Sequence, residues 1–388
     1  MSTTKEQMDT AQDVPILELL EIVLKRGASD LHITSGSAPT IRMHGSLQRL
    51  DQYPRLQPDQ LQRMIYSILT QKQRERLEQN LELDMSYSLP GKARFRVNVY
   101  FQRDALGAAF RLIPFEIKSV DELALPPQVE GLARLPRGLV LVTGPTGSGK
   151  STTLAALVDV VNSERDVHIM TVEDPIEFLH KHKRALVNQR EVGHDTHSFA
   201  EALKHVLRQD PDVILVGEMR DLETIQTALT AAETGHLVFA TLHTQDAPQT
   251  IDRIIDVFPP FQQQQVRVQL AVTLQGVVTQ QLLPTSDGRG RIVGAEVLIA
   301  TPAVRNLVRE AKIHQIYSTM QAGGRYGMQT MDQHLVALVR AGKITYETAA
   351  AQSHDVDELK NMLGRDDTGQ AAPTRPAAAS GSSVFMSG

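Results

Sequence analysis

The residues from Gly144 to Ser151, GPTGSGKS, carry the most specific chemistry in the chain. They match the pattern G-x-x-x-x-G-K-S, with the apolar run GLVLVT before it and a helical pattern after it. Glycines let backbone N–H groups surround a phosphate, the lysine reaches the terminal phosphates, and the serine hydroxyl ligates Mg²⁺. The pattern therefore predicts a P-loop that binds ATP and Mg²⁺, in preference to a chance glycine-rich turn. The predicted nucleotide-binding residues are Gly144, Pro145, Thr146, Gly147, Ser148, Gly149, Lys150, Ser151 and Thr152.

A carboxylate follows a second apolar run. The segment DVILVGE ends at Glu218, and Gly217 stands where this type of strand usually carries Asp. In P-loop proteins a carboxylate at a neighbouring strand end holds Mg²⁺ or its water. We therefore expect Ser151 to be a direct ligand of the metal and Glu218 to act on it through a water molecule.

The segment TVEDPIEF supplies more acidic side chains after another apolar run, at Glu173, Asp174 and Glu177. A carboxylate in this position can orient and polarise the water that attacks the γ-phosphate. We predict Glu177 as the base because Pro175 fixes the turn that presents it, with Glu173 as the next candidate. The alternative is an acidic, solvated loop.

The elements that must position these groups form an alternating pattern. Four apolar runs, GLVLVT, HIMTVED, DVILVGE and LVFATLH, are separated by helical segments. This alternation is typical of an α/β domain with a parallel central sheet and helices on its faces. From Asp246 the pattern is mostly helical, and LPTSDGRGRIVGAEVLI predicts a surface hairpin within it.

A smaller α+β domain is predicted before this sheet. ILELLEIVLKRG predicts a helix that ends at Gly27, and QPDQLQRMIYSILTQKQRERLEQN predicts one further amphipathic helix. ARFRVNVYFQR alternates strictly, with apolar residues from Ala93 to Phe101 on one face, and predicts a half-buried strand. DALG is expected to turn this strand into a hairpin partner, AAFRLIP.

Composition bounds the domain organisation and the function. We expect a mobile N-terminus over 1–13, the α+β domain over 14–118, a linker over 119–136, the ATPase domain with C-terminal helices over 137–365 and a disordered tail over 366–388. The 388 residues include no Cys, which excludes disulfides and cysteine zinc sites. A net charge of −5, 4% aromatic residues and no Trp argue against nucleic-acid binding. We see no apolar signal or membrane-spanning segment, so we expect a soluble intracellular protein.

The sequence resembles the type II/type IV secretion ATPases over roughly residues 15–360. Gly144–Ser151, EDPIEF, ILVGEMRDLET and TGHLVFATLHT are similar in order and spacing to the Walker A, Asp box, Walker B and His box of that family. ASDLHITSGSAPTIRMHGSL resembles the start of the family's first domain. The family's extension and type II secretion branches usually carry a four-cysteine zinc module, whereas AVRNLVRE resembles a motif of the PilT-type pilus-retraction branch. The resemblance implies a PAS-like first domain, a RecA-like second domain and a hexameric ring.

Two histidines flank the run LVFATLH, which we expect beside the P-loop strand. The carboxyl end of such a strand faces the nucleotide. His243 at that end can donate towards the γ-phosphate or hydrogen-bond the catalytic carboxylates. His236 at the start of the strand is expected near a domain or subunit boundary. For both, the alternative is a satisfied structural histidine.

Four arginines lie on the predicted hairpin of the first domain: Arg94, Arg96, Arg103 and Arg111. Phosphoryl transfer usually gains from a cation near the developing charge. The family resemblance favours Arg96 and Arg111 for that catalytic role, at the ATP of their own or of a neighbouring subunit. The alternative is a solvated polar face of the sheet.

The segment AVRNLVRE predicts a helix that couples the ring to its pilus-side work. The apolar residues Val304, Leu307 and Val308 recur at helical spacing and are predicted to be buried. The residues predicted to be exposed are Arg305, Asn306 and Arg309. The alternative is an ordinary solvated helix face.

Together these features predict a cytoplasmic, hexameric ATPase, peripheral at the inner face of the cell membrane, that powers retraction of a type IV pilus. The expected partners are further copies of the chain and an inner-membrane pilus platform protein, with a paralogous pilus ATPase as a further candidate. Nucleic acid and direct membrane insertion are not expected. The alternatives are a PilU-like accessory ATPase, which YFQR favours, a RecA-type nucleic-acid motor, and a regulatory partner that binds ATP without turnover.

Overall fold

The computed structural model describes residues 15–43, 45–113 and 116–364. The chain divides into two compact units, residues 1–117 with 175–180, and residues 118–174 with 181–388. The expectations for residues 1–13 and 366–388 fall outside the described residues. The segment expected as a linker contains a helix, α4 (Gln128–Ala133), whose Val129, Leu132 and Ala133 are buried in the core of the second unit.

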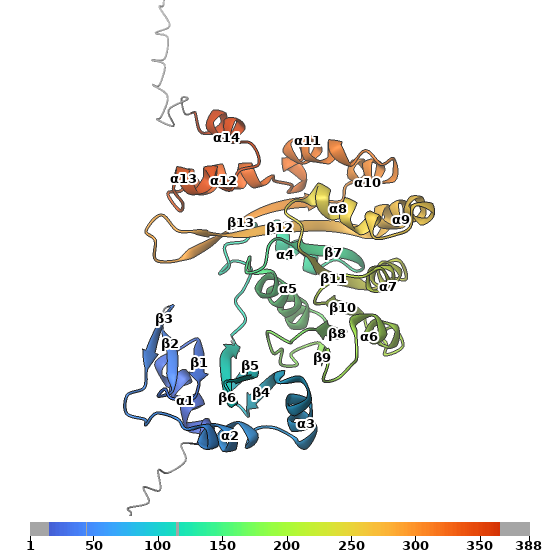
Figure 1. Ribbon diagram of the computed structural model, residues 1–388. Coiled ribbons are helices and arrows are strands. Elements are labelled where there is room, and N and C mark those ends of the chain that lie inside the picture. The colour runs from blue at the N-terminus through green and yellow to red at the C-terminus, as the bar shows by residue number, and fades with distance from the viewer. Residues whose placement is uncertain (1–14, 44, 114–115, 365–388) are drawn as a thin grey trace, which may run out of the picture. The chain divides into compact units, whose positions relative to one another are not determined.

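The first unit is built on a six-stranded antiparallel sheet with strand order β3-β2-β1-β6-β5-β4 (Figure 1). The strands are β1 (Asp30–Ile33), β2 (Thr40–Met43), β3 (Ser46–Arg49), β4 (Glu82–Leu89), β5 (Ala93–Gln102) and β6 (Ala105–Ile113). The helices described in this unit are α1 (Ile16–Arg26), α2 (Pro58–Tyr66) and α3 (Gln71–Asn80). Helix α1 ends at Gly27 as predicted, because Gly27 takes a left-handed conformation with φ of 65°.

The single helix predicted over residues 57–80 is wrong, because the chain forms α2 and α3 with a break between them. Helix α2 ends where the backbone N–H groups of Ile68 and Leu69 bond three residues back, to Ile65 and Tyr66. Helix α3 then begins at Gln71, capped by Thr70, whose hydroxyl accepts from the N–H of Gln73 in a capping box. Local capping thus outweighs the continuous amphipathic pattern.

The predicted hairpin is present as β5 and β6, with a shifted turn. Gln102 pairs with Ala105, so the turn residues are Arg103 and Asp104, with φ of 49° and 61°. The turn expected over DALG therefore begins one residue earlier. The alternating face of β5 is buried from Ala93 to Val99, but Phe101 is exposed.

The second unit contains a seven-stranded sheet with order β13-β12-β7-β11-β10-β8-β9. The strands are β7 (Gly138–Thr143), β8 (His168–Glu173), β9 (Leu186–Glu191), β10 (Val213–Val216), β11 (Leu237–Leu242), β12 (Leu274–Pro284) and β13 (Arg291–Ile299). Neighbouring strands are parallel except for β13, which is antiparallel to β12. The four predicted strands are therefore present, and the sheet extends beyond them on both sides.

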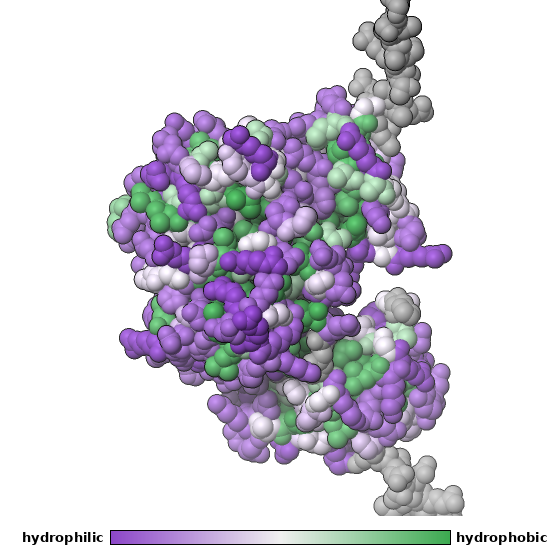
Figure 2. Space-filling view, turned by 180° about the vertical axis from the view of Figure 1, so that it is seen from behind, coloured by the Kyte–Doolittle hydropathy of each residue, from purple (hydrophilic) through white to green (hydrophobic). Residues whose placement is uncertain are grey.

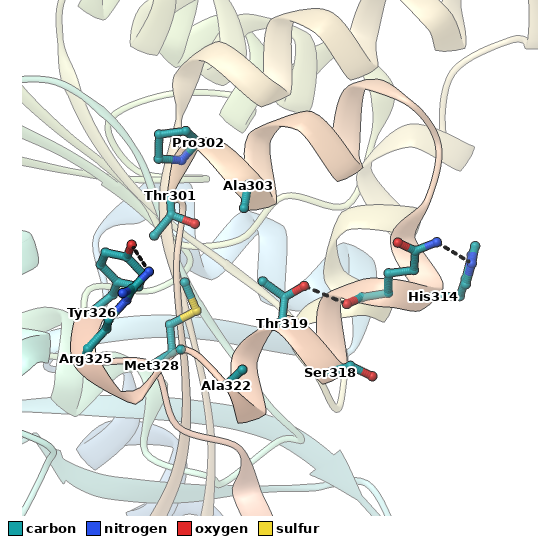
Figure 3. A pocket seen from close by; sticks show the side chains of 12 residues that line it. Thr301, Pro302, Ala303, His314, Ser318, Thr319, Ala322, Arg325, Tyr326 and Met328 are labelled. Atoms are coloured by element: carbon teal, nitrogen blue, oxygen red, sulfur yellow. Dashed lines mark hydrogen bonds between the residues drawn. The ribbon is translucent and has the colours of Figure 1, made fainter.

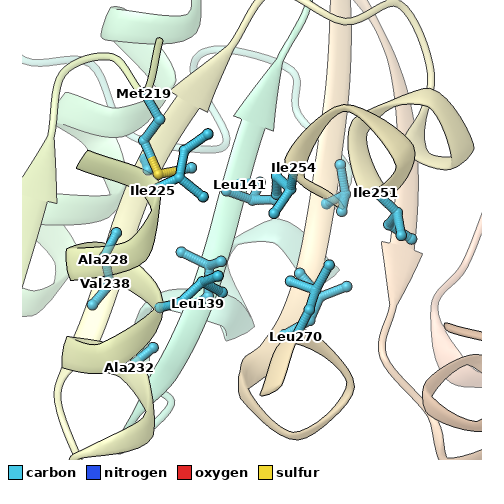
Figure 4. Close-up of a cluster of buried hydrophobic side chains, with 14 of the residues drawn as sticks. Leu139, Leu141, Met219, Ile225, Ala228, Ala232, Val238, Ile251, Ile254 and Leu270 are labelled. Atoms are coloured by element: carbon cyan, nitrogen blue, oxygen red, sulfur yellow. The ribbon is translucent and has the colours of Figure 1, made fainter. Parts of the chain in front are cut away.

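Helices cover both faces of this sheet (Figure 1). The further helices of the second unit are α5 (Lys150–Glu164), α6 (Phe199–Val206), α7 (Leu222–Glu233), α8 (Ala247–Asp256), α9 (Pro260–Thr273), α10 (Pro302–Arg309), α11 (Ile316–Gln321), α12 (Met331–Arg340), α13 (Tyr346–Ala350) and α14 (Val356–Leu363). Side chains alternate along β7, so Leu139 and Leu141 pack with α7, α8 and α9, as Figure 4 shows. Val140 and Val142 face the other side, where they pack with α4 and α5.

The surface hairpin predicted over residues 283–299 is wrong in its extent and its placement, because residues 274–282, predicted to lie in a mostly helical region, form most of its first strand. Strand β12 lies beside β7 in the middle of the unit, and most of its side chains are buried. Strand β13 is paired with it along its whole length and is also largely buried. Only the connection over residues 285–290 is a surface turn. Through β12, this hairpin contacts the P-loop.

Candidate nucleotide site

The P-loop joins β7 to α5 and encloses the head group of Lys150. Lys150 Nζ donates to the carbonyl oxygens of Gly144, at 2.9 Å, and Pro145, at 3.0 Å. Gly144 has φ of 135°, and a Cβ there would stand 2.2 Å from the carbonyl oxygen of Gln280. Only glycine fits this position, because the loop backbone lies directly against β12.

A buried glutamine on β12 supports the loop from behind. Gln280 Oε1 accepts from Thr153 Oγ1 at 2.8 Å, and Gln280 Nε2 donates to the carbonyl oxygen of Ser148 at 2.8 Å. Beside it, Thr143 Oγ1 and Thr279 Oγ1 are 2.9 Å apart. Gln280 was not identified from the sequence, because residues 246–282 were predicted to be mostly helical.

The carboxyl ends of β10 and β11 bring the predicted acid and histidine together. His243 Nε2 donates to Glu218 Oε1 at 2.9 Å, and Arg220 forms a second ion pair with the same carboxylate. The N–H of Met219 bonds the carbonyl of Thr241 at 3.1 Å, which locks the two strand ends together. Burial by itself would raise the pKa of Glu218, but Arg220 and His243 outweigh it and hold the pKa below its ordinary value. Arg220 was not predicted, although it stands two residues after Glu218 in the motif.

The close packing of β10 against β8 at Gly217 explains why this strand has glycine where Asp is usual. A Cβ at Gly217 would stand 3.2 Å from the Cα of Glu173 and from the carbonyl oxygen of Val172. The backbone of β10 is held against β8 there by a 2.8 Å hydrogen bond from the N–H of Gly217 to Val172. A longer side chain at Gly217 would force these strand ends apart.

The two candidate bases have different surroundings. Glu173, at the end of β8, accepts from Thr171 Oγ1 at 2.6 Å and from Gln189 Nε2 at 3.1 Å. Glu177 lies in the segment 175–180, which belongs to the first unit. Glu173 thus has hydrogen-bond partners on its own sheet, and the role of Glu177 remains a prediction.

His236 has a local structural role. Its Nδ1 is 2.9 Å from the carbonyl oxygen of Ala231 at the end of α7 and 3.2 Å from Thr234 Oγ1. The ring therefore helps to satisfy the last carbonyl groups of α7 before β11 begins. This arrangement agrees with the alternative of a satisfied structural histidine.

Arginines gather on one row of the sheet in the first unit. Arg96 on β5 stands directly opposite Arg111 on β6, and Arg111 stands opposite Asp30 on β1. Arg111 Nε donates to Asp30 Oδ1 at 2.9 Å, and Arg94 donates to Ser86 Oγ at 2.7 Å. Arg96 is exposed and makes no hydrogen bond or ion pair with the described residues of its unit. Arg42 on β2 also stands opposite Asp30, with Nε 3.8 Å from Oδ2. Three arginines therefore share one carboxylate, which leaves this row with unbalanced positive charge.

The predicted C-terminal motif forms α10, but one of its residues is placed differently. Val304 and Val308 are buried and Leu307 is partly buried, as expected. Arg305, expected to be exposed, donates from Nη1 to the carbonyl oxygens of Ala271, at 2.9 Å, and Val272, at 2.6 Å. These are the last carbonyls of α9, which have no partner inside that helix. The prediction for Arg305 was therefore wrong, because the end of α9 supplies acceptors within its reach.

A groove of about 880 Å³ lies beside the start of α10, remote in sequence from the P-loop (Figure 3). Pro302 and Ala303 line one side, and residues of α11 and the turn with Arg325 and Tyr326 line the other. Arg325 Nη2 donates to the Tyr326 hydroxyl at 2.7 Å. None of the predicted nucleotide-binding residues lines this groove.

The parallel sheet, the P-loop and the carboxylate–histidine pair at adjacent strand ends define a P-loop ATPase of RecA-like fold. A model of the family "Type II/IV secretion system protein" matches residues 7–361, and the chain belongs to this family. It is 53% identical over 334 residues to the type IV pilus retractation ATPase PilT of Pseudomonas aeruginosa, covering 86% of this chain and 96% of that one. Identity to the type IV pilus ATPase PilU of the same organism is 42% over 346 residues, covering 89% and 90%.

The solved structures agree with this assignment. A crystal structure of the pilus retraction motor PilT with bound ADP aligns with a TM-score of 0.85 and 50% identity, over 90% of this chain and 99% of that one. Within residues 15–43, 45–113 and 116–364, no helix has the length and apolar character needed to cross a membrane. The same residues contain no group of three or more His, Cys, Asp or Glu side chains that would hold a metal ion by themselves.

Proposed function

We propose that this chain hydrolyses ATP to power retraction of a type IV pilus. The observation that supports this most directly is a complete P-loop beside the Glu218–His243 pair. The chain is also 53% identical to PilT over 86% of its own length and 96% of the length of PilT. Identity to PilU is lower, which favours the retraction motor over the accessory alternative.

The nucleotide site suits phosphate binding. Lys150 Nζ lies in the loop mouth, and the first turn of α5 provides N–H groups without intrahelical acceptors. Ser148 Oγ is buried and has no hydrogen-bond partner in the described part of the chain. A buried hydroxyl of this kind is unusual without a ligand or water to satisfy it.

The donor set also fits Mg²⁺ bound together with the nucleotide. Mg²⁺ prefers oxygen ligands and is commonly held by one or two protein groups plus substrate phosphates. Ser151 would be the direct ligand, and Glu218, kept ionised by Arg220 and His243, would hold a metal-bound water. The metal would neutralise charge on the phosphates.

In the proposed reaction, Glu177 accepts a proton from the attacking water and orients it towards the γ-phosphate. Lys150 and the loop N–H groups hold the phosphates in place. His243 can exchange its hydrogen bond to Glu218 for one to the γ-phosphate, so that its position would report the nucleotide state.

Arg96 and Arg111 are proposed to stabilise negative charge during phosphoryl transfer. Like charges directly opposite on neighbouring strands are unfavourable, so the Arg96–Arg111 pair costs stability unless an anion approaches it. Asp30 balances only part of this charge. An ATP phosphate of the same or a neighbouring subunit is the proposed anion.

We propose that the chain acts as a homohexamer in the cytoplasm, at the inner face of the membrane, with an inner-membrane pilus platform protein and a paralogous ATPase as partners. Hydrophobic residues reach the surface of the second unit at several places (Figure 2). On α9, Phe261, Val268 and Val272 lie along one side and are 83%, 43% and 57% exposed. Exposed apolar side chains along one helix favour assembly with another protein surface.

Asn306 and Arg309 are exposed on α10. They are the residues proposed to couple the ring to its pilus-side work.

The test is retraction of fluorescently labelled pili in cells that lack this gene, complemented with the wild type or with Lys150→Ala. The wild type should restore retraction, and Lys150→Ala should not, although both proteins accumulate to the same level. Normal retraction in the deletion strain would exclude the motor role. Retraction that persists with reduced force would favour the accessory alternative.

A further inference from the structure

Gln280 contacts the P-loop from a strand that lies far from it in the sequence. The side chain is fully buried, and both ends of its amide are bonded within the second unit. The partner of Oε1 is the hydroxyl of Thr153 on α5, and the partner of Nε2 is the carbonyl oxygen of Ser148 in the loop, each at 2.8 Å.

The hydrogen-bonding capacity of the partners determines which end of the Gln280 amide faces the loop. A backbone carbonyl oxygen only accepts hydrogen bonds, so the group that faces Ser148 must be the NH₂ of Gln280. The Thr153 hydroxyl then donates to the remaining oxygen and holds the amide in this orientation. The three groups therefore form a chain of hydrogen bonds with a single direction, from α5 through β12 to the loop.

This arrangement determines the direction of a phosphate-binding donor. In a trans peptide the C=O of one residue and the N–H of the next point in opposite directions. By drawing the Ser148 carbonyl towards β12, Gln280 directs the N–H of Gly149 away from β12. Gly149 needs such a restraint, because it has φ of 90° at the start of α5 and no Cβ to limit its rotation.

We propose that Gln280 is a positioning residue for phosphate binding, acting through the peptide between Ser148 and Gly149. The proposal rests on nucleotide binding at the P-loop and does not depend on pilus retraction. Loop N–H groups contact the phosphates both before and during the reaction. A misdirected donor should therefore weaken ATP and ADP binding more than it slows turnover.

The main variant is Gln280→Leu, which replaces the amide with an apolar side chain of similar size and removes both hydrogen bonds. The matched control is Gln281→Leu, the same change at the next residue of β12. Gln281 points to the opposite side of the strand, is partly exposed and has no hydrogen bond to the loop. A second variant, Thr153→Val, removes only the bond that orients the amide.

The measurements are KM and kcat for ATP hydrolysis by the purified full chain, and the Kd for ADP by calorimetry. Circular dichroism should first show that each variant is folded at the assay temperature. For Gln280→Leu we expect KM and the ADP Kd to rise roughly tenfold, with kcat within about threefold of wild type. Thr153→Val should raise both constants about threefold, and Gln281→Leu should leave them unchanged.

Unchanged KM and ADP Kd in folded Gln280→Leu would overturn the proposal. Equal shifts in Gln280→Leu and Gln281→Leu would also overturn it, because they would indicate a general packing effect. If Gln280→Leu does not fold, Thr153→Val decides the question by the same two constants. A wild-type protein that binds and hydrolyses ATP but does not support retraction would contradict the proposed function and leave this test intact.

Discussion

Glu218 joins the two strand ends that carry the predicted chemistry. It accepts from His243 at 2.9 Å and also pairs with Arg220, so its charge is compensated on two sides. The result is a carboxylate that stays ionised at neutral pH despite partial burial. An ionised acid of this kind suits a metal-bound water better than it suits proton abstraction, since its low basicity disfavours taking a proton.

Glu177→Gln should therefore lose turnover and keep nucleotide binding. The amide preserves the shape of the side chain but cannot accept the proton of the attacking water. We expect kcat to fall about a hundredfold, with the ADP Kd within about twofold of wild type. Steady-state hydrolysis and calorimetry measure the two effects.

The comparison for this variant is Glu173→Gln. Glu173 is already hydrogen-bonded to Thr171 and Gln189, so its replacement should reduce kcat by less than about tenfold. If instead Glu177→Gln is fully active and Glu173→Gln is not, the base is Glu173.

At the scale of elements, α10 contributes to the stability of the helix before it in the chain. Arg305 donates to the carbonyls of Ala271 and Val272 at the end of α9. Its Nη2 also donates to Gln275 Oε1 at the start of β12, at 3.0 Å. One guanidinium thus connects three elements, which no periodicity within α10 would indicate.

Arg305→Ala should destabilise the protein by about 2 kcal/mol, because two carbonyl groups at the end of α9 lose a charged donor. The control is Arg309→Ala on the same helix. Arg309 is exposed and bonds only Asn306 among the described residues, so its loss should change stability by less than about 0.5 kcal/mol. Equilibrium urea unfolding measures both. Equal stability of the two variants would contradict the capping role of Arg305.

A second contact between elements predicts a pH dependence. Glu296 on β13 is almost fully buried, and its Oε1 accepts from the N–H of Ala247 at the start of α8 at 2.8 Å. Burial raises the pKa of Glu296 from 4.5 to about 7, despite hydrogen bonds from Ala247 and Met331 that favour the charged form. The folded state therefore binds a proton that the unfolded state releases between these two values.

The sign follows from proton linkage. The stability from neutral Glu296 is complete below the unfolded pKa and is lost as pH rises through the folded pKa. Glu296→Gln stays neutral at every pH, so it should gain stability relative to wild type between pH 5 and pH 8, by up to about 3 kcal/mol. Urea unfolding of both proteins across this range measures the difference. A difference that does not change with pH would contradict the raised pKa.

At the scale of the whole molecule, the arginine row and the nucleotide site belong to different compact units. If Arg96 acts on the ATP of a neighbouring subunit, two inactive variants should complement each other. Mixed subunits of Arg96→Ala and Lys150→Ala would form some sites with an intact arginine and an intact lysine. We expect part of the ATPase activity to return on mixing, in proportion to such sites.

Each variant alone should be inactive, and Arg103→Ala should remain active, because Arg103 lies in the β5–β6 turn and outside the row. Light scattering should give a hexamer for all of them. A fully active monomer, or no recovery in a mixture shown to exchange subunits, would rule out action between subunits.

The sequence alone determined the parts of this protein whose physical cause is local. The P-loop is contiguous in sequence, so its glycines, Lys150 and Ser151 could be recognised without knowledge of the fold. The buried strands β7, β8, β10 and β11 were predictable because continuous apolar runs between helices have few other stable arrangements. The order of the motifs then sufficed to indicate the family.

Only the tertiary structure decided which distant residues meet. Gln280 reaches the loop, and Arg305 reaches the end of α9, because β12 pairs beside β7 and carries its hairpin into the sheet. Hydrophobic periodicity specifies that a strand is buried but not which strand lies next to it. That choice depends on packing across the whole unit, and it places the buried polar side chains that support the site.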